Sequence, residues 1–367
     1  MYQTDQRIVI TLDAGGTNFV FGAMRGNRFI IDPITKPSNS HDLDLCIRTL
    51  ISGFEEVIAS LEQLPVAISF AFPGPADYAN GIIGGYLPNF PSFRDGVALG
   101  EILRRRFGIP VYINNDGDLF ALGEAMEGLL PEVNARIAAM GGEKKYTNLL
   151  GYTFGTGFGI GSVVGGRLNR GNNSCIETFC LPDTYDSNII IEDSVAIRAI
   201  KRVYGELTGN PDHGLTPKDI CEIADGTREG DREAAKEAFR RFGTAAGDAM
   251  ATAVTLTDSL VVIGGGLTGA ARHIMPALLE KMRSSISTLG GDKVNRVQMN
   301  VYDLDNENEF REFARGNGRP LKIHGTEETV TYDPVKRTGV AISRLGASEA
   351  ISIGAYVFAL ASLDGKQ

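Results

Sequence analysis

The stretch RIVITLDAGGTNFVFGAM (residues 7–24) is the most informative part of the sequence for the fold. An apolar run from Ile8 to Leu12 is followed by Asp13, two glycines and a second apolar run, which predicts a strand, a tight turn and another strand. Glycines at a strand end let backbone amides approach an anion closely, and the neighbouring carboxylate can hold an accompanying magnesium ion. The residues expected to contact phosphate are Gly15, Gly16 and Thr17. An ordinary hairpin can use the same Gly-Gly turn, so this stretch alone leaves both interpretations open.

Composition indicates an acidic, water-soluble chain with enough apolar material for two domains. It has 367 residues, of which 43% are hydrophobic and 22% are charged, and this length exceeds that of a usual single core. The formal net charge of -9 argues against a nucleic-acid-binding surface. Four scattered cysteines without a CxxC pair favour a reduced compartment, and we expect the cytoplasm. Because no secretory leader and no long apolar run is recognisable, we expect neither secretion nor membrane insertion.

Helical and strand-like apolar patterns alternate along the chain, which favours an α/β sheet. Residues 43–61 carry apolar side chains at helical spacing and precede Pro65. Short apolar runs at 66–72 and 111–113 predict buried strands. The other predicted elements are a helix from Asp116, strands at 149–154 and 160–164, a long helix at 231–256, a strand at 260–263 and a last helix at 348–360, in which Gly354 and Ala355 would permit close packing.

Residues 303–336 form a polar segment unlike the rest of the chain. The alternating sequence PLKIHGTEETVTYDP (320–334) predicts an exposed hairpin. Long surface insertions cost little entropy and need no function. A flap, a contact between subunits and a purely structural decoration therefore remain open.

A second glycine cluster, GYTFGTGFGIG (151–161), lies between two predicted strands. Its turn, Gly155, Thr156 and Gly157, offers backbone amides and a hydroxyl to the far side of a polyphosphate. Two such turns facing each other would hold a nucleotide tail. Neither turn matches the P-loop pattern, and the GxGxxG-like spacing in this cluster precedes a strand rather than a helix, so the common nucleotide-binding folds are disfavoured.

Asp116 follows Asn115 at the end of a predicted strand, where α/β proteins place functional groups. Phosphoryl transfer depends mainly on positioning and charge neutralisation, with a base such as aspartate orienting the attacking hydroxyl. Asp116 is therefore a candidate general base. An aspartate at the start of a helix is also a common N-cap, and the two roles are compatible.

Five motifs in order resemble the ROK family of sugar kinases, which belongs to the actin-like, ribonuclease-H-like ATPases. The order and spacing hold from about residue 7 to 300 and resume near the end of the chain. The five motifs are DAGGTN (13–18) for the first phosphate motif, FPGPADYANGIIGGYLPNFPSFRDGVALGEIL (72–103) for the sugar segment, NNDGDLFALGEA (114–125) for the catalytic aspartate, FGTGFGIG (154–161) for the second phosphate motif and VVIGGGLTGA (261–270) for the adenosine motif. The segment near the end of the chain is LGASEAISIGA (345–355).

The resemblance implies an actin-like ATPase fold of two α/β domains with a cleft between them. Residues 1–115 and 346–367 would form the smaller domain. Residues 116–345 would form the larger one, with the hairpin-like excursion at 303–336 inserted in it. The family also implies a homodimer.

The same resemblance implies a site for a sugar and for ATP with magnesium. Asp116 corresponds to the general base that activates the sugar hydroxyl, and Asp13 would serve the magnesium ion and the γ-phosphate. The residues implied to hold the sugar are Asn89, Asn115, Glu177 and Glu192. Those implied to line ATP are Asp13, Gly15, Gly16, Thr17, Gly155, Thr156, Gly157, Gly264, Gly265 and Gly266. Structural interpretations remain open for three groups: Asn89 as a turn residue, the two glutamates as solvated carboxylates and Gly264–Gly266 as a turn without ligand.

The chain departs from the family at its zinc motif, a histidine followed by three cysteines. CIETFCLPDTYDSNIIIED (175–193) places Cys180 where the family has the histidine and Tyr185–Asn188 where it has the cysteines. Zinc takes four thiolate or imidazole ligands at tight spacing, so we predict no structural zinc. Cys175 and Cys180 are expected to be buried small residues. Because the family's histidine also contacts sugar, the sugar preference is open.

The sequence thus favours ATP-dependent phosphorylation of a hexose, glucose or a related sugar, by a carbohydrate kinase that acts on a small molecule. A non-catalytic sugar or nucleotide sensor related to ROK regulators is the alternative, and the lost zinc motif supports it. Against it stand the intact Asp13 and Asp116. A chaperone-type ATPase of the same superfamily would leave the sugar segments unexplained.

Overall fold

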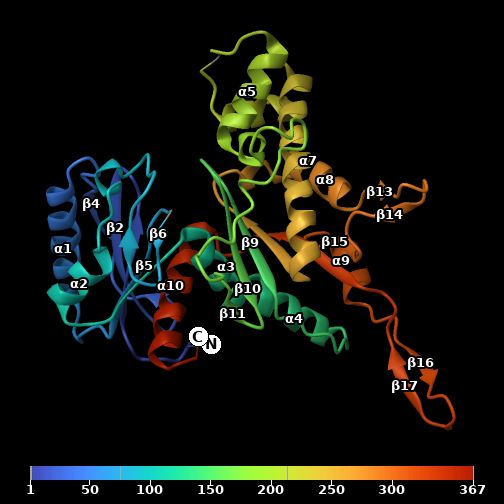
Figure 1. The fold of residues 1–367 in the computed structure, drawn as a ribbon, viewed down its shortest axis with the longest axis horizontal. Helices are drawn as coiled ribbons and strands as arrows, with labels where there is room; N and C mark the ends of the chain where they lie inside the picture. Colours follow the sequence, from blue (N-terminus) through green and yellow to red (C-terminus); the bar gives the residue numbers. More distant parts are fainter. Residues whose placement is uncertain (1, 75, 213, 367) are drawn as a thin grey trace. The chain divides into compact units, whose positions relative to one another are not determined.

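The computed structural model describes residues 2–74, 76–212 and 214–366 (Figure 1). Pro75, within the sugar-segment motif, lies outside the described residues. The chain divides into two compact units. The first unit comprises Met1–Gly128, Gly161–Ile176 and Leu345–Gln367, and the second comprises Leu129–Ile160 and Glu177–Arg344.

The first unit is built on a six-stranded sheet in the order β3-β2-β1-β5-β8, with β4 paired to β2. Its strands are β1 (Val9–Ala14), β2 (Asn18–Arg25), β3 (Arg28–Phe29), β4 (Ile34–Pro37), β5 (Ala67–Ala71) and β8 (Val111–Asn114). β1 pairs antiparallel with β2, whereas β1, β5 and β8 are parallel to one another. Asp13, Ala71 and Asn114 lie in register across these three strands. The parallel strands therefore end at one edge of the sheet, and Asp13 and Asn114 both lie there.

Helices cover both faces of this sheet (Figure 1). α1 (Leu43–Ser60) packs against β2 and β4, and α10 (Ala347–Leu363) packs against β1, β5 and α3 (Asp116–Met126). A Cβ atom at Gly354 would lie 1.9 Å from the carbonyl oxygen of Leu119, so only glycine allows α10 to approach α3 this closely. The smaller elements are β6 (Ala76–Asp77), β7 (Ile82–Ile83), the 3-10 helix η1 (Pro91–Phe93) and α2 (Leu99–Phe107).

The second sheet has the order β11-β10-β9-β12-β18-β15. Its strands are β9 (Leu149–Phe154), β10 (Phe158–Val164), β11 (Arg167–Leu168), β12 (Leu260–Gly264), β15 (Asn300–Asp303) and β18 (Arg337–Ile342). β9, β12, β18 and β15 are parallel. Residues of β10 from Gly161 onward, and β11, group with the first unit.

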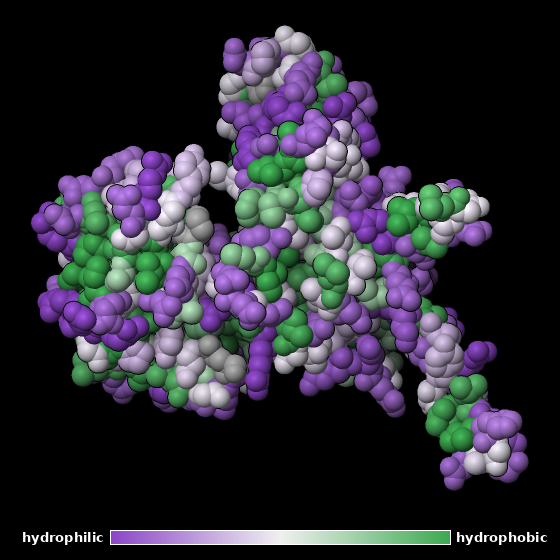
Figure 2. Space-filling model, viewed as in Figure 1, coloured by the Kyte–Doolittle hydropathy of each residue, from purple (hydrophilic) through white to green (hydrophobic). Residues whose placement is uncertain are grey.

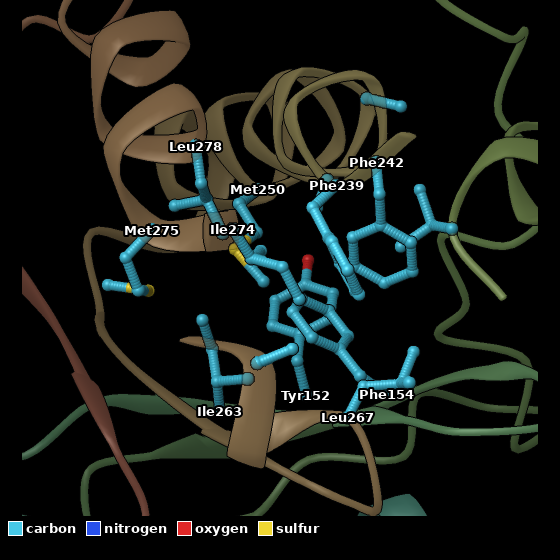
Figure 3. Packing of buried hydrophobic residues seen from close by; sticks show 14 of the residues in the cluster. Tyr152, Phe154, Phe239, Phe242, Met250, Ile263, Leu267, Ile274, Met275 and Leu278 are labelled. Carbon is cyan, nitrogen blue, oxygen red and sulfur yellow. The ribbon is translucent and has the colours of Figure 1, made fainter. Parts of the chain in front are cut away.

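Two long helices cover the second sheet. Figure 3 shows side chains of α7 (Arg232–Thr257) and α8 (Ala271–Met282) converging on those of β9 and β12. Phe154 and Phe242 meet edge to face with ring centroids 5.0 Å apart, an arrangement that adds to the stabilisation from burial. The other helices of this unit are α4 (Leu129–Ala139), η2 (Ile191–Ser194), α5 (Ile197–Thr208), α6 (Pro217–Asp225), η3 (Thr268–Ala270) and α9 (Glu307–Ala314).

Two hairpins extend from the second unit. The first joins β13 (Ser285–Ser287) to β14 (Lys293–Asn295), and the second joins β16 (Arg319–Lys322) to β17 (Thr329–Tyr332). Figure 2 shows hydrophobic patches on both, formed by exposed side chains. The hairpin expected within 303–336 is thus β16–β17, and α9 precedes it.

The α/β class and the actin-like fold predicted from the sequence agree with the structure, and the predicted elements lie within a few residues of the observed ones. The domain division at 115/116 stays a prediction; in the structure α3 packs against α10, and the first compact unit runs on to Gly128. Burial of Cys175 and Cys180 was predicted wrongly, since both side chains are exposed. No helix among the described residues is long and apolar enough to cross a membrane.

Candidate active site

Asp116 begins α3 directly after β8. The N-cap is Asn115, whose Oδ1 accepts a hydrogen bond of 2.8 Å from the Gly117 amide, and Asp116 Oδ1 accepts from the same amide at 2.8 Å. The capping role weighed for Asp116 is therefore filled by its neighbour. Asp116 is the first helical residue, and its side chain is exposed. A carboxylate in this position can accept a proton from a bound hydroxyl.

Three carboxyl groups near the sheet edge have raised pKa values. The side chains of Asp13 and Asp116 reach solvent, but surrounding protein atoms remove part of their hydration, which raises the pKa of each. The charge of Asp13 raises the pKa of Asp116 further, whereas the Gly117 amide lowers it. Burial raises the pKa of Asp118, which is 8% exposed, to about 7 despite the opposing charge of Arg170. Two mutually repelling carboxylates at an exposed edge fit a divalent cation, because its charge would relieve the repulsion.

The first glycine turn joins β1 to β2 and packs against the predicted sugar segment. A Cβ atom at Gly16 would lie 2.9 Å from Cβ of Asn89, so a glycine is required for this approach. Ser38 donates its hydroxyl to the carbonyl of Gly16 and its amide to the carbonyl of Thr17. The structure therefore brings the turn and Asn89 into direct contact within the first unit.

Two further side chains support the end of β8, and the sequence analysis missed both of them. Arg170 donates a 2.9 Å hydrogen bond to Oδ1 of the buried Asn114. Tyr78 donates its hydroxyl to the carbonyl of Phe72, and the side-chain Nδ2 of Asn115 donates to that hydroxyl at 3.5 Å. Arg170 lies 56 residues from Asn114 and Tyr78 lies 37 residues from Asn115 along the chain, so only the fold reveals these two pairs.

The second glycine turn joins β9 to β10 and rests on Glu192. Glu192 Oε2 accepts a 3.0 Å hydrogen bond from the Phe158 amide, and a Cβ atom at Gly157 would lie 3.0 Å from that oxygen. Arg198 pairs with Glu192 at 3.0 Å and donates to the Thr156 carbonyl at 3.3 Å. Glu192, expected at the sugar, is therefore bound to the turn expected at the nucleotide.

The third glycine run begins at Gly264, the last residue of β12. Gly265 has φ +94°, and a Cβ atom there would lie 2.4 Å from the Phe154 carbonyl oxygen. The Leu267 amide donates to the same carbonyl at 3.2 Å. Gly265 is thus required for backbone packing against the end of β9, and its two neighbours, Gly264 and Gly266, flank that contact.

Glu177 and the diverged zinc segment complete the predicted set. Glu177 is half-buried, and its charge contributes with burial to raising the pKa of Tyr152. Exposed Cys175 donates to the carbonyl of Asn173.

Among the described residues, Cys221, Asp225 and His273 form a group with metal-ligand chemistry. The Arg272 guanidinium already binds Asp225 and lies 3.2 Å from the Cys221 sulfur. The Arg272 guanidinium therefore already supplies a positive charge to this group, and we assign no metal to it.

Comparison with known proteins identifies the family. The ROK family model matches residues 9–177 and 188–307. The chain belongs to the ROK family. A crystal structure of glucokinase from Parabacteroides distasonis is 53% identical, with a TM-score of 0.90 over 98% of this chain and 99% of that one. Glucokinase from Thermotoga maritima is 27% identical over 75% of this chain and 86% of its own. The assignment to glucokinase-like carbohydrate kinases is confirmed.

The family also contains regulators. The DNA-binding transcriptional repressor Mlc of Escherichia coli is 25% identical over 72% of this chain and 65% of its own length. Family membership alone therefore does not separate the kinase from the sensor.

Proposed function

We propose that this ROK protein transfers the γ-phosphoryl group of ATP to a hydroxyl of a hexose, with glucose or a related sugar as substrate. The observation that carries the proposal is the edge of the first sheet. Asp13, Asp116 and the Gly15–Thr17 turn lie there, and the turn packs against Asn89. A phosphate turn, a candidate base and a candidate sugar ligand thus occur in one compact unit.

In the proposed reaction, Asp116 takes the proton of the attacking sugar hydroxyl. The hydroxyl oxygen forms a bond to the γ-phosphorus, the bond to the β-phosphate oxygen breaks, and ADP and a sugar phosphate are released. Asn89 and Asn115 would hold neighbouring hydroxyls. A magnesium ion bound with ATP, held by Asp13, would neutralise phosphate charge. The raised pKa of Asp116 makes it a stronger base than an ordinary carboxylate.

The nucleotide would be held by the glycine runs. Gly155–Gly157 present backbone to the phosphates, and Gly264–Gly266 would line the nucleoside. Gly16 and Gly157 are both positions where a Cβ atom would crowd a neighbouring side chain, as expected for turns built to leave backbone accessible.

The proposal is tested by magnesium-dependent ADP release from ATP over a panel of hexoses, N-acetylhexosamines and ketoses. We expect sugar-stimulated turnover with glucose or a related hexose, and Asp116→Asn to reduce kcat by about 10²–10⁴-fold, the range typical for a general base. The acidic limb of the pH profile should lie above the ordinary range for aspartate, because activity requires the ionised form and the pKa is raised. Sugar binding without turnover under any condition would overturn the kinase and favour the sensor.

The sensor remains the second candidate because of the likeness to Mlc. A regulator has no use for a base, so the unmodified protein would bind sugar without turnover and Asp116→Asn would have no activity to remove. We further propose that the protein is a homodimer located in the cytoplasm. Light scattering of the purified protein can check the dimeric state.

A further inference from the structure

The β16–β17 hairpin exposes both of its strands to solvent along their whole length. Every residue of Arg319–Lys322 and of Thr329–Tyr332 is exposed, and the hairpin extends from the second unit as a ribbon of two strands (Figure 1). Such a ribbon is at best marginally stable in water on its own, and an exposed strand edge readily pairs with another chain. We therefore expect this ribbon to be covered by a partner.

The ribbon has one apolar and one polar face, because residues directly opposite each other on paired strands share a face. The register of β16 with β17, continued by the 2.9 Å hydrogen bond from the Ile323 amide to the Glu328 carbonyl, puts six side chains on the first face: Arg319, Leu321, Ile323, Glu328, Val330 and Tyr332. The apolar members of this set are 37% to 48% exposed. The second face carries Pro320, Lys322, Thr329 and Thr331.

Opposite charges mark the two ends of the apolar face. Arg319 lies at the base, with its guanidinium 6.0 Å from the centre of the Tyr332 ring, and Glu328 lies beside the turn at the tip. Within residues 2–74, 76–212 and 214–366, neither of these charged groups forms an ion pair, whereas Lys322 on the polar face pairs with Glu327 at 2.9 Å. The apolar face thus carries a positive end, an apolar centre and a negative end.

Such a face is complementary to itself when one copy is reversed. Two ribbons stacked face to face, with the base of one over the tip of the other, bring Arg319 of each copy near Glu328 of the second copy. Leu321 and Val330, in the middle of the face, then meet their own counterparts. Stacking base over base would instead bring like charges together, which is unfavourable.

We propose that the β16–β17 ribbon is a dimerisation arm, whose apolar face packs on the same face of a second copy of the chain in the reversed orientation. A symmetric dimer uses the same patch on both partners, and this patch supplies its own complement. Four half-exposed apolar side chains cover less than the about 800 Å² that each partner buries in a standard interface, so the association should be reversible on dilution. The proposal locates a contact of the proposed homodimer and is independent of the kinase reaction.

The chain contains no tryptophan, so an introduced one reports whether the ribbon is covered. Tyr332→Trp places the indole on the apolar face. Thr331→Trp, the matched control, places it one residue away on the polar face. We expect acrylamide to quench the fluorescence of Tyr332→Trp several-fold less than that of Thr331→Trp at high protein concentration. The difference should disappear on dilution, because the two copies then separate.

Charge reversal on the Tyr332→Trp background identifies the partner. Arg319→Glu and Glu328→Arg should each raise the dimer Kd about tenfold, because each dimer then contains like charges at both ends. An equimolar mixture of the two variants should recover the original Kd, because a dimer with one copy of each has opposite charges at both ends. Lys322→Glu reverses a charge on the polar face and should leave the Kd unchanged.

Three results would overturn the proposal. Equal quenching of the two tryptophan variants at every concentration would show that the apolar face is not covered. A protected Tyr332→Trp that responds to neither charge reversal would show that another segment of the same chain, or a different partner, covers it. A mixture that does not recover the Kd would exclude the reversed pairing of two copies. These measurements need no substrate, so they stand whether or not the protein is an active kinase. A dimer seen by light scattering with an uncovered ribbon would place the homodimer contact elsewhere.

Discussion

The two glycine turns have the same outline and different supports. Each has three residues and joins two neighbouring strands, Gly15–Thr17 between β1 and β2 and Gly155–Gly157 between β9 and β10. The first is supported by neutral groups, Ser38 and Asn89. The second rests on the ion pair of Glu192 and Arg198. A neutral support is insensitive to salt, whereas a half-exposed ion pair is screened. The same backbone shape therefore depends on different forces in the two turns.

The largest effect at the two turns is expected for Gly16→Ala. The new Cβ would lie 2.9 Å from Cβ of Asn89, an atom next to the backbone that cannot swing away. The Asn89 segment must therefore shift, and we expect kcat/KM to fall about 100-fold and the free energy of unfolding to fall by about 1–3 kcal/mol. Steady-state kinetics and urea unfolding measure the two effects.

Gly155→Ala is the control for stability in this experiment. Nothing lies within 4 Å of a Cβ atom built at Gly155, so its melting temperature should match that of the unmodified protein. If Gly16→Ala were as stable and active as the unmodified protein, the contact with Asn89 would have no role.

The second turn should tolerate the equivalent change better. A Cβ atom at Gly157 would lie 3.0 Å from Glu192 Oε2, the end of a side chain that can move by a few tenths of an ångström. We expect Gly157→Ala to raise the KM for ATP about fivefold, which corresponds to about 1 kcal/mol. The loss should grow with added salt, because the displaced carboxylate then depends on a screened ion pair. Titrations at low and high salt test this, and a salt-independent loss would contradict the charged support.

Local sequence patterns were enough to predict much of the fold and part of the candidate site. The apolar runs and glycines of 7–24 predicted β1, its turn and β2 because strand and turn preferences act over a few residues. The last helix and its Gly354 contact were predictable for the same reason. The partners of Asn114 and Glu192 were not, because Arg170 lies 56 residues from Asn114 and Glu192 contacts a turn 34 residues earlier. The exposure of Cys175 and Cys180 was also missed, because it depends on how the 171–190 loop packs and not on the residue type.

Asp118 is a buried carboxylate of the first unit that lies away from the glycine turn, and its substitution is expected to act on stability. The folded pKa of about 7 lies above the ordinary 3.8, so ionisation of Asp118 opposes folding. Its cost is absent below pH 4, grows as the pH rises toward 7 and is constant above. Asp118→Asn should therefore leave stability unchanged at pH 4 and raise it by at most about 4 kcal/mol at pH 8.

Urea unfolding at pH 4, 6 and 8 measures this dependence, with Asp95→Asn on the same unit as the exposed control. Equal stability of Asp118→Asn and the unmodified protein at pH 8 would mean that Arg170 fully compensates the buried carboxylate. Each unit would then contain a balanced charge pair. The two pairs would differ only in position: Asp118 and Arg170 lie behind the sheet edge of the first unit, and Glu192 and Arg198 lie beneath the glycine turn of the second. A pH-dependent difference in stability would instead mean that the Asp118 charge is not compensated in the first unit. The Glu192 carboxylate of the second unit is paired with Arg198 at the turn where the ligand is proposed to bind.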